Sequence, residues 1–162
     1  MQIEYFQLID RIVDLDVDNR TIRTQAIVPV ASTIFEGHFP GYPLMPGVLL
    51  LESMAQSSGW LLVGLYEFSR MPFLAAFSDA KLRSFVKPGD TLDISAALVH
   101  EGSGFARTKA QIHCGGKLAC NAEMTFRVVE FPNQELRAHM ERAATALAFP
   151  RKIADQLCDR GR

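Results

Sequence analysis

An apolar stretch that follows a loop rich in proline and glycine constrains this chain more than any other feature of its sequence. Residues 37–66 read GHFPGYPLMPGVLLLESMAQSSGWLLVGLY. The prolines restrict the backbone of the loop, and Pro46 suits the first turn of a helix, where a missing N–H costs nothing. From Gly47 onward apolar residues cover nearly every helical face, which is typical of a buried helix. The sequence therefore predicts a shaped loop over residues 30–46 and a buried helix over residues 47–66.

Glu52 is the only side chain in this stretch that is formally charged at neutral pH. Burial raises the pKa of a carboxyl group by desolvation, which suits an acid catalyst. Gln56 lies one helical turn further on and can orient that carboxyl, while His38 supplies a base on the preceding loop. The backbone N–H groups of Gly47 and Val48, at the start of the helix, are suited to bind a developing oxyanion.

The same residues also allow structural interpretations. Residues 44–65 are long enough to span a membrane, but Glu52, Gln56 and three serines in the middle argue against a transmembrane helix. Glu52 alone could be a structural residue bonded to the backbone, and His38 alone could be incidental. Their occurrence together on a proline and glycine frame favours a functional site.

Composition and charge argue against several classes of function. A chain of 162 residues has the length of one domain, and its net charge of -1 gives no general attraction to nucleic acid or an anionic membrane. The first ten residues lack the pattern of a signal peptide, so we expect a cytoplasmic protein without membrane insertion. Cysteine and histidine spacing predicts no disulfide framework, no metal site and no cofactor. The cysteines are Cys114, Cys120 and Cys158.

Alternating apolar and polar residues predict that most of the remaining chain is β-sheet. This period of two is typical of antiparallel strands with one buried face. Residues 102–104 and 115–116 predict hairpin turns, and residues 87–90 predict a further turn. The expected strands are residues 10–17, 21–29 and 73–86, followed by three that start near Leu92, Ala106 and Leu118. Residues 3–9 fit either a short helix or an entering strand. The layout predicts an α+β fold in which the sheet wraps the helix.

The loop and the helix together closely resemble the 3-hydroxyacyl-[acyl-carrier-protein] dehydratases of bacterial fatty acid synthesis. The resemblance is to the hydroxymyristoyl-type, FabZ-like branch, which has Glu where the dehydratase/isomerase branch has Asp. The matching residues are His38-Phe39-Pro40-Gly41, Pro43, Met45-Pro46-Gly47-Val48, Glu52 and Ala55-Gln56. The resemblance implies a hotdog fold over residues 1–131, with a curved antiparallel sheet around a long central helix. Residues 4–11 keep only the end of the motif that usually opens the family.

The reaction that this resemblance implies is removal of water from a (3R)-3-hydroxyacyl thioester on acyl carrier protein, which gives a trans-2-enoyl thioester. His38 would take the α-proton, and the backbone N–H of Gly47, helped by Val48, would stabilise the enolate-like oxygen. Glu52, supported by Gln56, would protonate the leaving hydroxyl. Thioesterase and catalytically silent acyl-sensor functions are alternatives, which the presence of both His38 and Glu52 disfavours. Additional isomerase activity is a third alternative, which Glu52 in place of Asp disfavours.

The resemblance also suggests residues that contact the substrate and its carrier. Phe39, Tyr42, Pro43 and Met45 are candidates for the substrate tunnel, although Phe39 and Met45 fit core packing equally well. Carrier proteins are acidic, so exposed basic residues are candidate contacts. These are Lys81, Arg83 and Lys87. The sequence leaves acyl chain length open, including specialised long chains such as those destined for lipid A.

The working unit that the family implies is a homodimer, in which each site pairs the histidine of one subunit with the glutamate of the other. Three such dimers grouped into a hexamer are a further expectation. Residues 132–162 form a separate extension, in which 134–148 are strong helix formers with one apolar face. This extension could pack on the same domain, cover a neighbouring subunit or help to form the contact with the carrier protein. Pro150 should end its helix, and residues 151–162 are charged.

Overall fold

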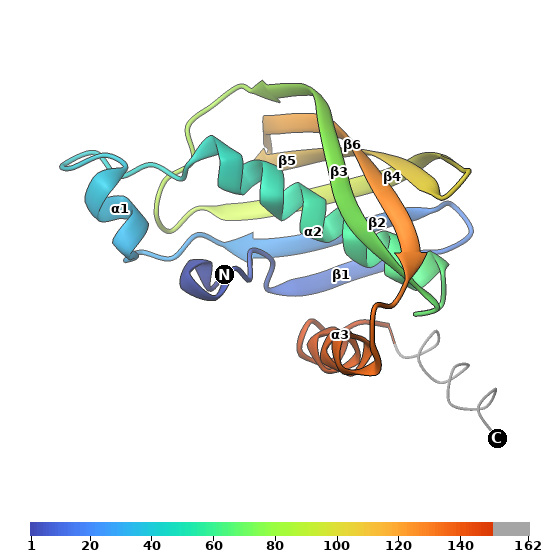
Figure 1. Ribbon diagram of the computed structural model, residues 1–162. Helices are drawn as coiled ribbons and strands as arrows, with labels where there is room; N and C mark the ends of the chain where they lie inside the picture. Colours follow the sequence, from blue (N-terminus) through green and yellow to red (C-terminus); the bar gives the residue numbers. More distant parts are fainter. Residues whose placement is uncertain (151–162) are drawn as a thin grey trace.

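A curved antiparallel sheet of six strands wraps a long central helix in the computed structural model, which describes residues 1–150 (Figure 1). The strand order is β1-β2-β4-β5-β6-β3, so β1 and β3 form the two edges. The strands are β1 (Arg11–Asp16), β2 (Thr21–Ile27), β3 (Arg70–Leu82), β4 (Thr91–Gly102), β5 (Phe105–Cys114) and β6 (Lys117–Glu130). The helices are α1 (Thr33–Gly37), α2 (Gly47–Leu65) and α3 (Gln134–Ala146). The predicted α+β fold is confirmed.

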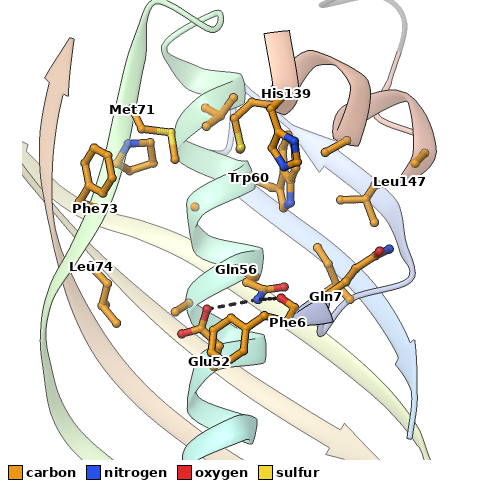
Figure 2. Close-up of a pocket in the computed structure, with 18 of the residues that line it drawn as sticks. Phe6, Gln7, Glu52, Gln56, Trp60, Met71, Phe73, Leu74, His139 and Leu147 are labelled. Carbon is orange, nitrogen blue, oxygen red and sulfur yellow. Dashed lines mark hydrogen bonds between the residues drawn. The ribbon is translucent and has the colours of Figure 1, made fainter. Parts of the chain in front are cut away.

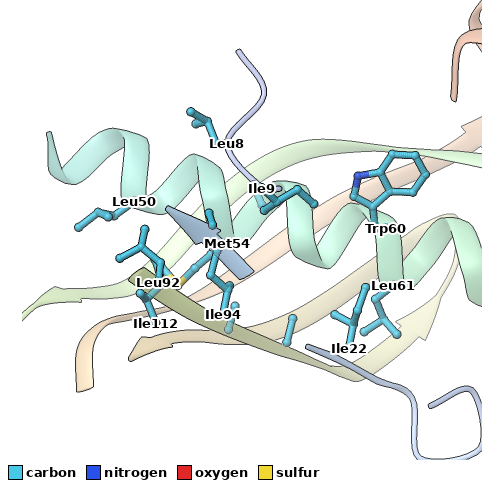
Figure 3. Packing of buried hydrophobic residues seen from close by; sticks show 14 of the residues in the cluster. Leu8, Ile9, Ile22, Leu50, Met54, Trp60, Leu61, Leu92, Ile94 and Ile112 are labelled. Atoms are coloured by element: carbon cyan, nitrogen blue, oxygen red, sulfur yellow. The ribbon is translucent and has the colours of Figure 1, made fainter. Parts of the chain in front are cut away.

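The core lies between α2 and the concave face of the sheet. Met54 and Leu61 on α2 pack among sheet residues such as Ile22, Ile94 and Ile112, and all five are no more than 1% exposed (Figure 3). The period-two pattern places the apolar side of β4, β5 and β6 toward the helix, as the sequence predicts. Burial of this apolar surface is the main favourable contribution to folding.

Buried hydroxyl groups join α2 to the sheet as well. Thr24 of β2 and Ser57 of α2 share a hydrogen bond of 2.6 Å, and Thr108 of β5 donates to Ser58 over 3.0 Å. Ser57 also donates to the Ser53 carbonyl. Because each buried hydroxyl has a partner, the helix carries polar residues in its interior without an unpaired group.

The expectation that α2 is buried on every side is wrong for its first two turns. Val48 is 70% exposed and Glu52 is only half buried, because the sheet covers the opposite side of the helix. β3 is exposed along most of its length as well. We call these exposed apolar residues the apolar edge. They are Val48, Phe73, Leu74, Phe77 and Leu82. Among residues 1–150, α2 is long and apolar enough to cross a membrane by length and composition, and 61% of its apolar window is buried inside the structure.

The turns between strands lie where the sequence predicts them, but one short helix was not predicted. Both predicted hairpin turns are present, and Gly104, Gly115 and Gly116 in them have positive φ angles. Residues 30–46 were expected to be loop throughout, but residues 33–37 form the short helix α1. The Ser32 side chain caps it by accepting a hydrogen bond from the Ile34 N–H, and five residues are too few for a periodic signal. The N-terminal segment contains a 3₁₀ turn, η1 (Ile3–Tyr5).

The predicted C-terminal helix is present as α3, which packs against the same chain. Asn133 caps its start by accepting from the Leu136 N–H over 2.7 Å. At its other end the Leu147 carbonyl accepts from the Ile12 N–H of β1 over 2.8 Å. Residues 151–162, including Cys158, lie outside the described part of the chain.

Candidate active site

The loop that carries His38 is tied to its surroundings at several points. The His38 N–H donates to the carbonyl of Ile34 in α1, and the His38 carbonyl accepts from the Leu44 N–H, both over 2.9 Å. The Met45 N–H donates to the Val86 carbonyl over 2.8 Å, which joins the loop to the segment after β3. Gly41 has a φ of +76°, as the third residue of a type II turn requires. The expected rigid shape of this loop therefore has a basis in backbone hydrogen bonds.

The His38 ring makes a hydrogen bond through one of its two nitrogens, Nδ1, within residues 1–150. Its Nδ1 lies 2.9 Å from the Leu44 carbonyl oxygen, which can only accept. Nδ1 must therefore carry the proton in that hydrogen bond, and Nε2 then holds the lone pair that a general base needs. The Phe39 ring stacks on the imidazole with centroids 4.3 Å apart and limits its rotation.

The Glu52 carboxyl is held by Gln56, as predicted from their spacing. Gln56 Nε2 donates to Glu52 Oε1 over 3.2 Å and to the Phe6 carbonyl over 2.8 Å. Gln56 Oε1 accepts from the Leu8 N–H over 2.9 Å, which fixes the orientation of the amide. Burial raises the pKa of the Glu52 carboxyl, and the hydrogen bond from Gln56 lowers it to a smaller extent. The group can therefore hold a proton at a higher pH than an exposed glutamate.

The start of α2 leaves backbone donors free, because Pro46 is its N-cap and makes no side-chain capping bond. The first N–H groups of a helix, here those of Gly47 and Val48, have no acceptor within the helix. Gly47 also meets β3 closely, since a Cβ built there would lie 2.2 Å from Leu82 Cδ1. A side chain at position 47 would displace Leu82. Glycine therefore allows α2 to pack against β3 and also leaves the Gly47 N–H accessible.

A cavity of about 780 Å³ runs along one side of α2 (Figure 2). Glu52 and Gln56 line it, together with residues of the N-terminal segment, β3 and α3. His38 does not line this cavity, and neither do Gly47 and Val48. A single chain therefore does not bring the candidate base and the candidate acid together at this cavity.

The tunnel candidates occupy different environments. Met45 is 4% exposed and belongs to the hydrophobic core, whereas Phe39 and Tyr42 are about half exposed on the loop. Pro43 lies on a shallow surface hollow beside α1. Like His38, these four residues do not line the cavity of their own chain.

The basic candidates lie on the exposed end of β3 and the segment that follows it. Lys81, Arg83 and Lys87 are all exposed. The Arg83 guanidinium donates twice to Asn121 Oδ1, over 2.9 and 3.1 Å. The Lys87 ammonium lies 5.6 Å from the centre of the Tyr42 ring, which places it beside the loop of the candidate base.

Sequence reasoning missed the groups that orient the two candidate side chains. Backbone atoms of Phe6, Leu8 and Leu44 make these hydrogen bonds. Because nearly every residue type offers the same backbone groups, the sequence does not indicate which of them will bond. Sequence reasoning also missed that α3 contributes to the cavity. Within residues 1–150, no three His, Cys, Asp or Glu side chains gather into a possible metal site.

Comparison with known proteins agrees with this arrangement. The model of the FabA-like domain matches residues 2–123, which include α2 and the loop before it. The chain belongs to this family. It is 39% identical over 128 residues to the 3-hydroxyacyl-[acyl-carrier-protein] dehydratase FabZ of Chlamydia abortus, covering 77% of this chain and 83% of the relative. It is 38% identical over 122 residues to FabZ of Proteus mirabilis, covering 74% of this chain and 81% of the relative.

Solved structures support the fold of this FabA-like chain. A hypothetical thioesterase with coenzyme A from Streptococcus pneumoniae has a TM-score of 0.61 at 18% identity, covering 76% of this chain and 88% of that one. The dehydratase heterocomplex ApeI:P from Xenorhabdus doucetiae has a TM-score of 0.60 at 19% identity, covering 83% of this chain and 90% of that one. At such low identity the likeness concerns the fold, and it confirms the hotdog architecture that the sequence resemblance implies.

Proposed function

We propose that this protein dehydrates (3R)-3-hydroxyacyl-[acyl-carrier-protein] to trans-2-enoyl-[acyl-carrier-protein] in fatty acid biosynthesis. The observation that carries the proposal is a half-buried Glu52 with a raised pKa, oriented by Gln56 on the wall of a largely apolar cavity, in a chain that resembles FabZ. A protonated carboxyl can release a hydroxyl as water, and an apolar cavity suits an acyl chain. A cytoplasmic location is part of the same proposal.

In the proposed reaction, His38 Nε2 removes the α-proton of the thioester, and the electrons of that C–H bond move toward the thioester carbonyl. The N–H groups of Gly47 and Val48 stabilise the resulting enolate-like oxygen at the helix N-terminus. The C–O bond at the β-carbon then breaks, and Glu52 gives its proton to the departing hydroxyl, which leaves as water. Transfer of the proton from His38 back to Glu52 through solvent restores the starting state.

We further propose a homodimer in which His38 of one subunit and Glu52 of the other form each site. Two features support this arrangement: His38 is not at the cavity that Glu52 of the same chain lines, and the apolar edge lies next to the start of α2. An open edge strand with exposed apolar residues is a surface that a second copy can cover. Grouping of three dimers into a hexamer remains an expectation from the family resemblance.

The carrier protein is proposed to dock beside Lys81, Arg83 and Lys87. These cations are exposed, and Lys87 lies against Tyr42 of the loop that carries His38. Acidic carrier proteins would be attracted to such a surface, and the thioester would then enter beside the candidate base. Replacement of a single lysine by alanine should raise KM more than it lowers kcat.

The direct test is incubation of the purified protein with 3-hydroxyacyl carrier protein, followed by mass spectrometry of the carrier. We expect loss of one water, and we expect His38→Ala and Glu52→Gln each to lower the rate by about 10²-fold or more while the fold is retained. Release of free acid would identify a thioesterase instead. An unchanged thioester, under conditions where a FabZ relative works, would contradict the proposal and favour an acyl sensor.

A further inference from the structure

We infer that α3 closes the far end of the acyl cavity, and that Met140 and Ala143 of α3, with Trp60 of α2, limit the length of the acyl chain. The inference rests on the proposed function, because it assumes that the cavity beside Glu52 takes the acyl chain of the substrate. It assigns a role in specificity to the part of the chain that lies beyond the FabA-like match.

The cavity is continuous from the candidate acid to α3. Its lining follows α2 from Glu52 to Val63, and α3 residues line the same cavity (Figure 2). Eleven residues of helix correspond to a length of about 16 Å. With C–C bonds of about 1.5 Å, an extended alkyl chain advances about 1.3 Å per carbon, so this length holds about twelve methylene groups. A long acyl chain that starts at Glu52 would therefore reach α3.

The residues at this end of the cavity suit the end of an alkyl chain. Trp60 is 7% exposed, and Met140 and Ala143 are partly buried against the core. His139 and Arg142 also line the cavity, and both are exposed. The more buried residues at this end of the cavity are thus the apolar ones.

The position of α3 is fixed by further contacts between the end of this helix and the rest of the chain. The Leu147 carbonyl is bonded to the Ile12 N–H, and the Phe149 ring packs against the rings of Trp60 and Phe68. Gly64 leaves room for this packing, because a Cβ there would lie 3.1 Å from Phe149 Cζ. Because α3 is anchored in this way, it can block a longer acyl chain without being displaced.

α3 lies outside the part of the chain that the FabA-like domain matches. The FabA-like match ends at residue 123, whereas α3 begins at Gln134. Met140 and Ala143 belong to α3, whereas the candidate catalytic groups lie on α2 and the loop before it. Substitutions in α3 can therefore change the limit on chain length while the catalytic residues stay the same.

The test narrows the cavity at α3 and measures chain-length preference. Ala143→Phe should lower kcat/KM for 3-hydroxypalmitoyl carrier protein by about tenfold or more, since even one methylene in an apolar pocket changes specificity by about that factor. Activity on 3-hydroxybutyryl carrier protein should not change. Thr145→Phe is the matched control, because Thr145 is exposed on the same helix and does not line the cavity. Met140→Ala should have the opposite effect and extend the accepted length.

A second readout does not depend on turnover. Trp60 is the only tryptophan of the chain, so its fluorescence reports occupancy of this end of the cavity. Titration with 3-hydroxypalmitoyl-pantetheine should change the emission, whereas 3-hydroxybutyryl-pantetheine should not. Ala143→Phe should raise the Kd for the long thioester by about tenfold, by the same steric argument.

These outcomes separate the two claims. Equal chain-length profiles for wild type, Ala143→Phe and Met140→Ala, with equal Kd values for the long thioester, would overturn the inference while leaving the dehydratase proposal intact. Failure to dehydrate any carrier thioester would contradict the proposed function, and the fluorescence titration would then still decide whether α3 meets the end of an acyl chain.

Discussion

At the scale of single residues, the surroundings of each candidate group prepare it for one role in proton transfer. The Leu44 carbonyl holds the proton on Nδ1 of His38, which leaves Nε2 as the basic atom. Burial raises the pKa of Glu52, while Gln56 holds its carboxyl in place. A base and an acid with these properties can remove one proton and supply another within a single reaction.

The raised pKa of Glu52 has a consequence for stability. Because the folded state binds this proton more tightly than the unfolded state, the stability of the wild type falls as pH rises from below the ordinary value of 4.5 through the raised pKa. Glu52→Gln removes this dependence. The melting temperature of the variant, relative to wild type, should therefore increase from acidic to neutral pH. A constant difference across this range would show that the carboxyl ionises as freely in the fold as in water.

Gln56 should influence the pH profile without taking part in proton transfer. Its hydrogen bond lowers the pKa of Glu52, so Gln56→Met should raise that pKa further and move the alkaline limb of kcat/KM to higher pH. Gln111→Met, at an exposed position on β5, is the control. A fall in rate with no movement of the limb would assign Gln56 a role in packing alone.

At the scale of elements, α2 depends on paired hydroxyl groups for its attachment to the sheet. Thr24 and Ser57 are each no more than 1% exposed and are bonded to each other. Ser57→Ala should cost about 1–3 kcal/mol in the free energy of unfolding, because the Thr24 hydroxyl loses this partner in the interior.

Chemical denaturation of the single and double variants measures this pair. Thr24→Val combined with Ser57→Ala should recover part of the loss, because neither hydroxyl is then left buried without a partner. A double variant whose loss equals the sum of the two single losses would show that the two hydroxyl groups act independently.

The elements themselves could be predicted from the sequence because their signals are local and periodic. The alternation in β4, β5 and β6, the turn glycines and the apolar run of α2 all act within about a dozen residues, and each was located correctly. The five-residue α1 could not be seen, because its cap at Ser32 is the only signal it carries.

The candidate site could be predicted only in part, because its assembly depends on contacts between distant segments. The spacing of Glu52 and Gln56 predicts their hydrogen bond, which lies within one helix. The bonds from Gln56 to Phe6 and Leu8 join segments far apart in the sequence through backbone atoms. The packing of α3 beside Trp60 likewise follows from tertiary contacts that no local pattern encodes.

At the scale of the whole molecule, the proposed site depends on an apolar surface that a single chain leaves exposed. The apolar edge runs along β3 to the start of α2, where Leu82 lies against Gly47. If a second copy covers this surface, Phe77→Arg should shift the protein toward monomers, because a charge would be buried without a partner. The sedimentation coefficient and the dehydratase activity of this variant should both decrease. A variant that stays dimeric and active would show that the interface lies elsewhere.

The most direct test of the shared site is to mix two inactive variants, His38→Ala and Glu52→Gln, and to measure dehydration after subunits exchange. In a two-fold dimer each mixed pair holds one site with both native residues, so random exchange should restore about a quarter of wild-type activity. Mixing either single variant with the variant that carries both substitutions should restore no activity. If mixed dimers form, as native mass spectrometry would report, and activity stays absent, then His38 and Glu52 do not meet across two chains and the account is wrong.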